Sequence, residues 1–119
     1  MKNILVLIII GMIGQACTNA SEDDLIDATP LPTSITYEAH VKPIIDNNCI
    51  SCHNDPPVNG APMALTAYED VKNAIETRGL IERISSEDQS FLMPFGGPRL
   101  PQNLIDLVVQ WEMDGLLNN

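Results

Sequence analysis

The chain has 119 residues, of which 45% are hydrophobic, and its formal net charge is −10 at pH 7. This length allows one modest hydrophobic core and therefore a single folded domain. The acidic balance argues against nucleic acid and anionic lipid surfaces as electrostatic partners and favours a partner protein with a basic patch. Solubility alone would explain the same charge.

The N-terminus has the pattern of a targeting segment. Lys2 precedes an aliphatic run over 4–13, which suits the core of a signal peptide and is too short to span a membrane. The run leads into Ala16-Cys17, which resembles the lipobox of bacterial lipoproteins. The resemblance implies that residues 1–16 are a lipoprotein signal peptide and that Cys17 is lipidated. The protein would then be exported and anchored to a bacterial membrane, facing the periplasm or the cell surface. An ordinary secretory signal, with Cys17 left as a free thiol, is the alternative.

The segment 17–34 is polar and acidic and carries no useful helical stripe. Such a composition predicts a flexible tether between the anchor and the folded part. The folded domain is expected over 35–119.

The first predicted helix covers 37–47 and delivers the chain to a cysteine pair. Pro43 is expected in its first turn, so the regular helix should begin near Ala39. Its apolar face follows the helical period and consists of Val41, Ile44 and Ile45.

Residues 49–53 read CISCH, two thiols three positions apart followed directly by an imidazole. This is the attachment signature of c-type haem, in which the thiols add to the vinyl groups of the porphyrin and the histidine binds iron. Zinc sites and thiol redox centres also use Cys-x-x-Cys. A zinc site would need a second ligand pair, and only Cys17 and His40 remain outside the motif. A thioredoxin-like centre would need a strand-helix-strand pattern, which we do not find.

Three further helices are predicted, and no strand. The segment 54–64, rich in Pro and Gly, should be a loop that wraps an edge of the haem. The second helix is expected over 67–77 behind a capping box of Thr66 and Glu69, with Val71, Ala74 and Ile75 on its apolar face. A short third helix covers 80–85, with Leu80, Ile81 and Ile84. The last helix spans 102–116, and its apolar stripe is Leu104, Leu107, Val108 and Trp111.

Between the last two helices, Met93-Pro94 lies in a glycine-containing loop over 91–98. A methionine before proline avoids the helical region, and in a loop it can present its thioether to haem iron opposite a histidine. A core methionine that fills a gap is the alternative reading of the same residue.

Together these motifs resemble class I c-type cytochromes: V-x-P-I at 41–44, C-x-x-C-H at 49–53, M-P at 93–94 and W-x-x-x-G at 111–115. The resemblance covers about residues 36–117. It implies an all-α fold, in which a small helical domain wraps around one covalently bound haem c. It also implies that Cys49 and Cys52 are the thioether anchors. His53 would then be the proximal iron ligand and Met93 the distal one.

Several other residues of types that can bind haem or iron are expected to have packing or surface roles. Met63 is expected to pack near the haem edge, and His40 to point away from the attachment site. Met113 is expected on the surface or in the core, and Trp111 at the helix crossing as a packing residue. Two arginines could pair with haem propionates or simply be exposed, namely Arg83 and Arg99.

A haem whose two axial positions are filled by the protein suits outer-sphere electron transfer, so we expect a single-electron carrier and no enzyme. One alternative is a haem-bearing relay subunit of a larger respiratory or dehydrogenase complex. The other is a haem protein that reacts with gases or peroxide through an open sixth site, if Met93 is not bound.

Overall fold

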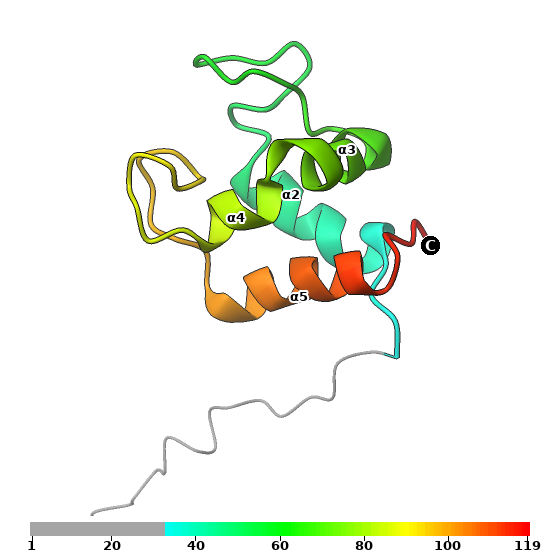
Figure 1. Ribbon diagram of the computed structural model, residues 1–119. Coiled ribbons are helices and arrows are strands. Elements are labelled where there is room, and N and C mark those ends of the chain that lie inside the picture. Colours follow the sequence, from blue (N-terminus) through cyan, green and yellow to red (C-terminus); the bar gives the residue numbers. More distant parts are fainter. Residues whose placement is uncertain (1–32) are drawn as a thin grey trace, which may run out of the picture. The chain divides into compact units, whose positions relative to one another are not determined.

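The structure, a computed structural model, describes residues 33–119 (Figure 1). Its elements are η3 (Tyr37–Val41, a π-helical turn), α2 (Lys42–Asn48), α3 (Tyr68–Arg78), α4 (Leu80–Ser85) and α5 (Gln102–Met113). Within this part of the chain every regular element is a helix, which confirms the all-α prediction. None of these helices is long and apolar enough to cross a membrane. The predicted signal peptide, Cys17 and most of the predicted tether lie outside the described residues.

The first helical segment is divided at Lys42. The N–H groups of Val41 and Lys42 donate to carbonyls five residues back, which makes η3 wider than an α-helix. The regular helix begins only at Lys42, with Pro43 in its first turn. The predicted start near Ala39 is therefore wrong. An α-helix from Ala39 would need an N–H from Pro43 on the Ala39 carbonyl, and proline has none.

The N-cap of α3 is Ala67, one residue after the predicted cap Thr66. Ala67 is the extended residue before the helix, and its N–H donates to the Asp70 carboxylate at 3.2 Å. The predicted pairing of Thr66 with Glu69 is therefore wrong, although the helix itself is confirmed. At the other end Gly79 has φ 64°, a left-handed conformation that lets α4 start directly after α3.

Helix α4 has its predicted bounds, but α5 ends at Met113, three residues before its predicted end. Gly115 (φ 89°) and Leu116 (φ 58°) reverse the chain there. The N–H of Leu116 then donates back to the carbonyl of Trp111 at 2.9 Å, which is a Schellman-type helix stop. Gly115 therefore lies in the turn that ends α5 and not in the last turn of the helix.

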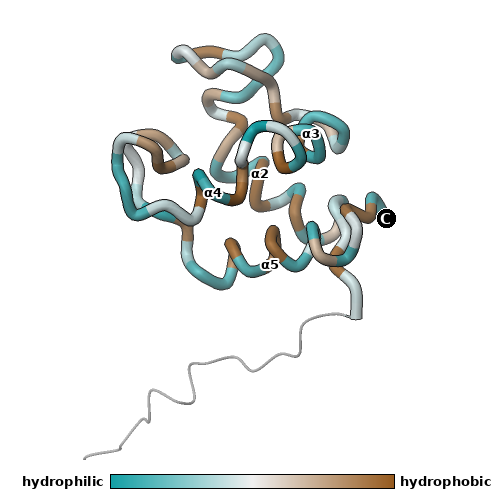
Figure 2. The backbone as a smooth tube through the Cα atoms, in the orientation of Figure 1, coloured by the Kyte–Doolittle hydropathy of each residue, from teal (hydrophilic) through white to brown (hydrophobic). Residues whose placement is uncertain are grey.

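The core lies between the helices, and the predicted apolar faces supply most of it. The buried members of those faces are Val41, Ile44, Ile45, Val71, Ala74, Ile75, Leu80, Ile84, Val108 and Trp111. Figure 2 shows the hydrophobic residues of α5 on the side that faces α2 and α4. One detail of α5 differs from prediction, because Leu104 and Leu107 are only partly buried while Ile105 is 2% exposed.

Helices η3 and α5 pack against each other through aromatic rings. Trp111 is fully buried, and its ring centre lies 5.7 Å from that of Tyr37. Tyr68 at the start of α3 completes the group, at 5.5 Å from Tyr37. These three rings pack together at the end of the domain where the described chain begins and ends.

The two ends of the described chain are also joined by hydrogen bonds. The N–H of Ile35 donates to the Asp114 carboxylate at 2.6 Å, and the N–H of Tyr37 donates to the Leu117 carbonyl at 2.8 Å. The Ile35 N–H, followed by the amide of Gln110, holds the pKa of Asp114 below its usual value of 3.8. The entry of the chain is thereby tied to the segment after α5.

Candidate functional site

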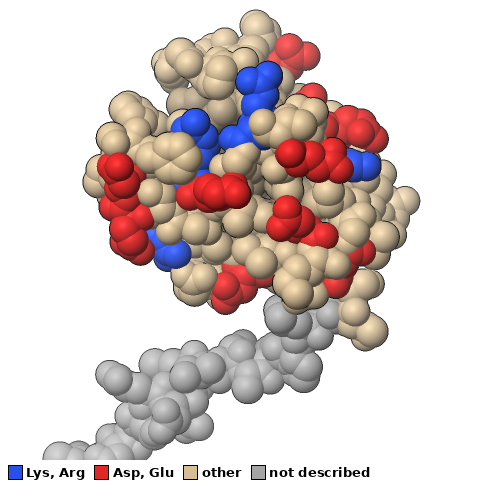
Figure 3. Space-filling view, viewed as in Figure 1, with Lys and Arg blue, Asp and Glu red and all other residues tan. Residues whose placement is uncertain are grey.

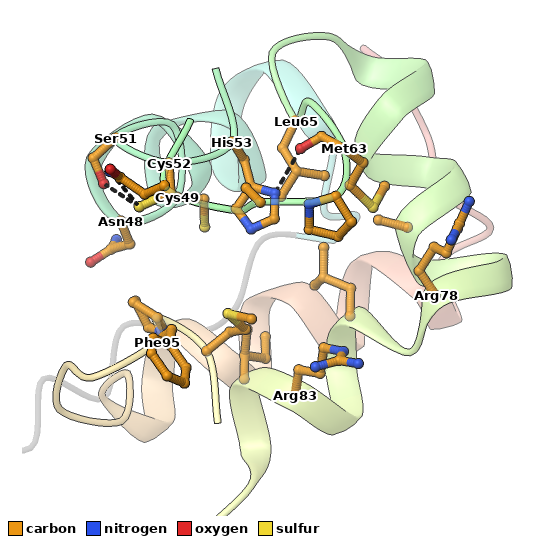
Figure 4. Close-up of a pocket in the computed structure, with 18 of the residues that line it drawn as sticks. Asn48, Cys49, Ser51, Cys52, His53, Met63, Leu65, Arg78, Arg83 and Phe95 are labelled. Carbon is orange, nitrogen blue, oxygen red and sulfur yellow. Dashed lines mark hydrogen bonds between the residues drawn. The ribbon is translucent and has the colours of Figure 1, made fainter. Parts of the chain in front are cut away.

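The end of the domain away from the aromatic group contains a cavity of about 710 Å³ (Figure 4). All four residues implied as haem anchors and ligands line it: Cys49, Cys52, His53 and Met93. The rest of the wall comes from Asn48, Ser51, loop 59–65, α3, α4 and residues 94–95. The fold therefore brings Met93 to the same cavity as a motif forty residues earlier in the sequence.

The cysteine motif is a single tight turn at the end of α2. That helix ends at Asn48, and the Cys49 N–H still donates to the Ile45 carbonyl at 2.8 Å. The carbonyl of Cys49 then accepts two N–H groups, from Cys52 at 3.2 Å and from His53 at 3.0 Å. The helix end thus places both thiols and the imidazole within one turn of chain.

The imidazole of His53 is held in one tautomer by the following loop. Its Nδ1 lies 2.8 Å from the carbonyl oxygen of Met63. A carbonyl oxygen can only accept, so Nδ1 must carry the proton and Nε2 presents its lone pair. This is the second-sphere arrangement that prepares a histidine to bind a metal. Figure 4 shows the His53 ring directed into the cavity.

Hydrogen bonds hold loop 54–64 and the residue after it against the cysteine motif. The N–H of Val58 donates to the Cys52 carbonyl at 2.9 Å, and the N–H of Leu65 donates to the His53 carbonyl at 2.8 Å. With the His53–Met63 contact, three hydrogen bonds hold the loop against residues 52–53. Met63 therefore contributes through its backbone as well as by lining the cavity.

The two thiols, both free, have different surroundings. Burial raises the pKa of the Cys49 thiol to about 11. Thiol redox centres depend on the opposite, a lowered pKa that yields the thiolate near neutral pH. Cys52 is half-buried, and the Asn59 side-chain amide donates to its sulfur at 3.6 Å. Asn59 is a site residue that the sequence did not single out.

Charges around the cavity have one sign. Arg78 and Arg83 are among its lining residues, and within residues 33–119 no Asp or Glu lines it. Figure 3 shows basic side chains gathered near α3 and α4, with acidic ones spread around them. Arg78, which the sequence analysis did not consider, stands at the end of α3 just before Gly79. Arg99 is not in the lining, because its Nε donates to the Ser85 carbonyl at 3.1 Å.

The remaining candidates lie outside the cavity. His40 accepts the Thr36 N–H on its Nδ1 at 3.1 Å, and it does not line the cavity. Met113 is 73% exposed, whereas Trp111 is buried where α5 crosses η3. Within residues 33–119 no three His, Cys, Asp or Glu side chains are grouped so as to hold a metal ion.

No protein-family model, no curated protein and no solved structure matches this chain.

Proposed function

We propose that this chain is a c-type cytochrome that carries single electrons on one covalently attached haem. The observation that carries the proposal is the convergence of Cys49, Cys52, His53 and Met93 on one cavity of about 710 Å³. Met63 lines the same cavity, so its wall holds two thioethers, and the resemblance to class I c-type cytochromes is what selects Met93 as the ligand.

The cavity suits a porphyrin in size and chemistry. Its volume, about 710 Å³, lies within the range of about 300–1,000 Å³ for cofactor sites. Apolar side chains of α3 and α4 form part of the wall: Ala74, Leu80 and Ile84. Two guanidinium groups, Arg78 and Arg83, match the two carboxylates of a haem, and those carboxylates would meet no acidic side chain among the described lining residues.

Each site residue has a definite task in this proposal. The thiols of Cys49 and Cys52 would attach the haem by addition to its two vinyl groups, each sulfur bonding one carbon and its hydrogen going to the other, so that no oxidant is needed. His53 would hold the iron through Nε2, with its tautomer fixed by the Met63 carbonyl. Met93 would hold the iron through its thioether.

When bound, haem supplies an iron centre that gains or loses one electron. If His53 and Met93 both held the iron, external ligands would be kept from it, which suits a carrier rather than an enzyme. The net charge of −10 favours partner proteins with basic patches and disfavours nucleic acid. Lipidation of Cys17 would hold the carrier on a membrane outside the cytoplasm.

Optical spectra of the exported protein, oxidised and reduced, test the proposal. We expect the bands of a low-spin c-type haem and, in the oxidised protein, the weak sulfur-to-iron charge-transfer band. A protein without haem absorption would contradict the whole proposal. Haem absorption without the charge-transfer band would contradict the role of Met93 alone.

A further inference from the structure

The segment between α4 and α5 closes on the end of α4 through two helix carbonyls. The last carbonyls of a helix have no partner within it. Here the N–H of Met93 donates to the Arg83 carbonyl at 3.1 Å, and Arg99 Nε donates to the Ser85 carbonyl at 3.1 Å. The backbone of Met93 is therefore fastened directly to α4.

The Arg83 side chain makes a second contact with the same segment. Its guanidinium lies 4.5 Å from the ring centre of Phe91, two residues before Met93. Leu92, between them, is 1% exposed, whereas Phe91 is 40% exposed. Phe91 therefore keeps a large part of its ring exposed, and the Arg83 guanidinium lies against that ring.

We propose that Arg83 is a positioning residue for Met93, because its stacking on Phe91 keeps segment 88–93 closed on α4 and the Met93 thioether in the cavity. This inference rests on the proposed function, in which Met93 is an axial ligand. When the segment opens, Met93 withdraws and an external ligand can enter. The Arg83–Phe91 contact favours the closed form.

The size of the effect follows from the type of contact. A guanidinium on a partly exposed ring changes such an equilibrium by a factor of about two to five. An external ligand that binds only the open form has an apparent affinity proportional to the open fraction. Loss of the contact should therefore raise that affinity about two- to fivefold.

The experiment is an imidazole titration of the oxidised, haem-loaded protein, followed by its absorption spectrum. Arg83→Gln removes the guanidinium, and Phe91→Leu removes the ring but keeps the charge of Arg83. Each should raise imidazole affinity about two- to fivefold. Arg83→Gln also removes a guanidinium from the cavity wall, so Phe91→Leu is the variant that isolates the contact. The double variant should match Arg83→Gln, because that substitution already removes the contact. The control is Lys72→Gln, which removes a cation lying 5.9 Å from the Tyr68 ring and outside the cavity lining.

Unchanged affinity in Phe91→Leu, or an equal rise in Lys72→Gln, would overturn the role of Arg83. So would additive effects in the double variant. Hydrogen exchange at the Met93 amide gives a readout that does not depend on iron ligation, and it should be faster in both single variants than in Lys72→Gln. A parent protein without the sulfur-to-iron band would contradict the ligand role of Met93, and the exchange rates would still decide the Arg83–Phe91 contact.

Discussion

Where η3 crosses α5, the rings of Tyr37, Tyr68 and Trp111 fill the space between the helices. At the other end, around residues 49–53, the helices and loops instead surround a cavity of about 710 Å³. The chain has five aromatic residues, and the two phenylalanines lie on the loop beside the cavity, with Phe95 76% exposed. The aromatic end completes its own packing, whereas the cavity end leaves room for a large apolar partner.

Polar groups follow the same division. At the aromatic end Trp111 Nε1 donates to the Leu117 carbonyl and the Tyr68 hydroxyl donates to the Leu116 carbonyl, both at 2.8 Å. The Tyr37 hydroxyl is the one buried side-chain polar atom without a partner among the described residues, and burial raises its pKa. The cavity wall instead carries two thiols, two thioethers and the imidazole of His53. Closely packed aromatic rings thus occupy one end of the domain, and the groups suited to binding a cofactor occupy the other.

The largest effect is expected from the cysteines of the cavity end. The double substitution Cys49→Ser and Cys52→Ser removes both sulfurs that could form thioethers, so the exported chain should carry no covalent haem. Haem retention after denaturing electrophoresis measures this. The matched control is Cys17→Ser, which removes the third cysteine and should retain the haem while losing membrane attachment. Covalent haem on the double variant would contradict the assignment of haem attachment to the cysteines of the cavity end.

The next effect distinguishes two methionines of the same cavity. Met93→Ala should abolish the sulfur-to-iron band and allow rapid carbon monoxide binding to the reduced protein, because the sixth position opens. Met63→Ala is the control, since it removes a thioether but keeps the carbonyl that accepts from His53. Loss of the band in Met63→Ala, with the band retained in Met93→Ala, would identify Met63 as the ligand and contradict the role of Met93.

At the aromatic end the expected effect is on stability. Trp111→Ala deletes a fully buried side chain and should lower the free energy of unfolding by about 3–5 kcal/mol, measured by urea denaturation. The sulfur-to-iron band of the folded protein should persist. Met113→Ala, on the exposed side of the same helix, should change the free energy of unfolding by no more than about 0.5 kcal/mol. A Trp111 variant of undiminished stability would contradict the structural role of this end.

The smallest effect concerns Asp114, which ties the entry of the chain to the segment after α5. Its pKa is lowered in the folded protein, so folding favours the ionised carboxylate. The stabilisation is present above the unfolded value of 3.8 and is lost as the pH falls through the lower folded pKa. Asp114→Asn should therefore be less stable than the parent near neutral pH, with the difference shrinking below about pH 4. Urea denaturation at several pH values measures it, and a difference that does not change with pH would sink this explanation.

The sequence predicted the helices and their apolar faces well because both follow a local period. Val71, Ala74 and Ile75 are buried as expected. The errors lie at helix ends, such as Thr66 and the residues after Met113. These positions depend on which carbonyl accepts which N–H, and a one-residue shift satisfies the same pattern of residue types.

Part of the candidate site could also be anticipated from sequence. The motif at 49–53 is local, and Met93 followed from a resemblance. Arg78 could not be anticipated. It is the last residue of α3, and its place beside the cavity depends on the turn at Gly79, where α3 ends and α4 begins. For Arg99 the sequence left two readings open, pairing with haem propionates or simple exposure; its Nε instead fastens the segment before α5 to the Ser85 carbonyl. Which arginine faces a cavity depends on where a helix ends.

The most direct test of the account is the mass of the peptide that contains residues 49–53, released by proteolysis from the exported protein. The account predicts that this peptide carries one haem bound through two thioethers, and that a peptide containing Met93 carries none. A peptide of unmodified mass, or one in which Cys49 and Cys52 form a disulfide, would contradict it.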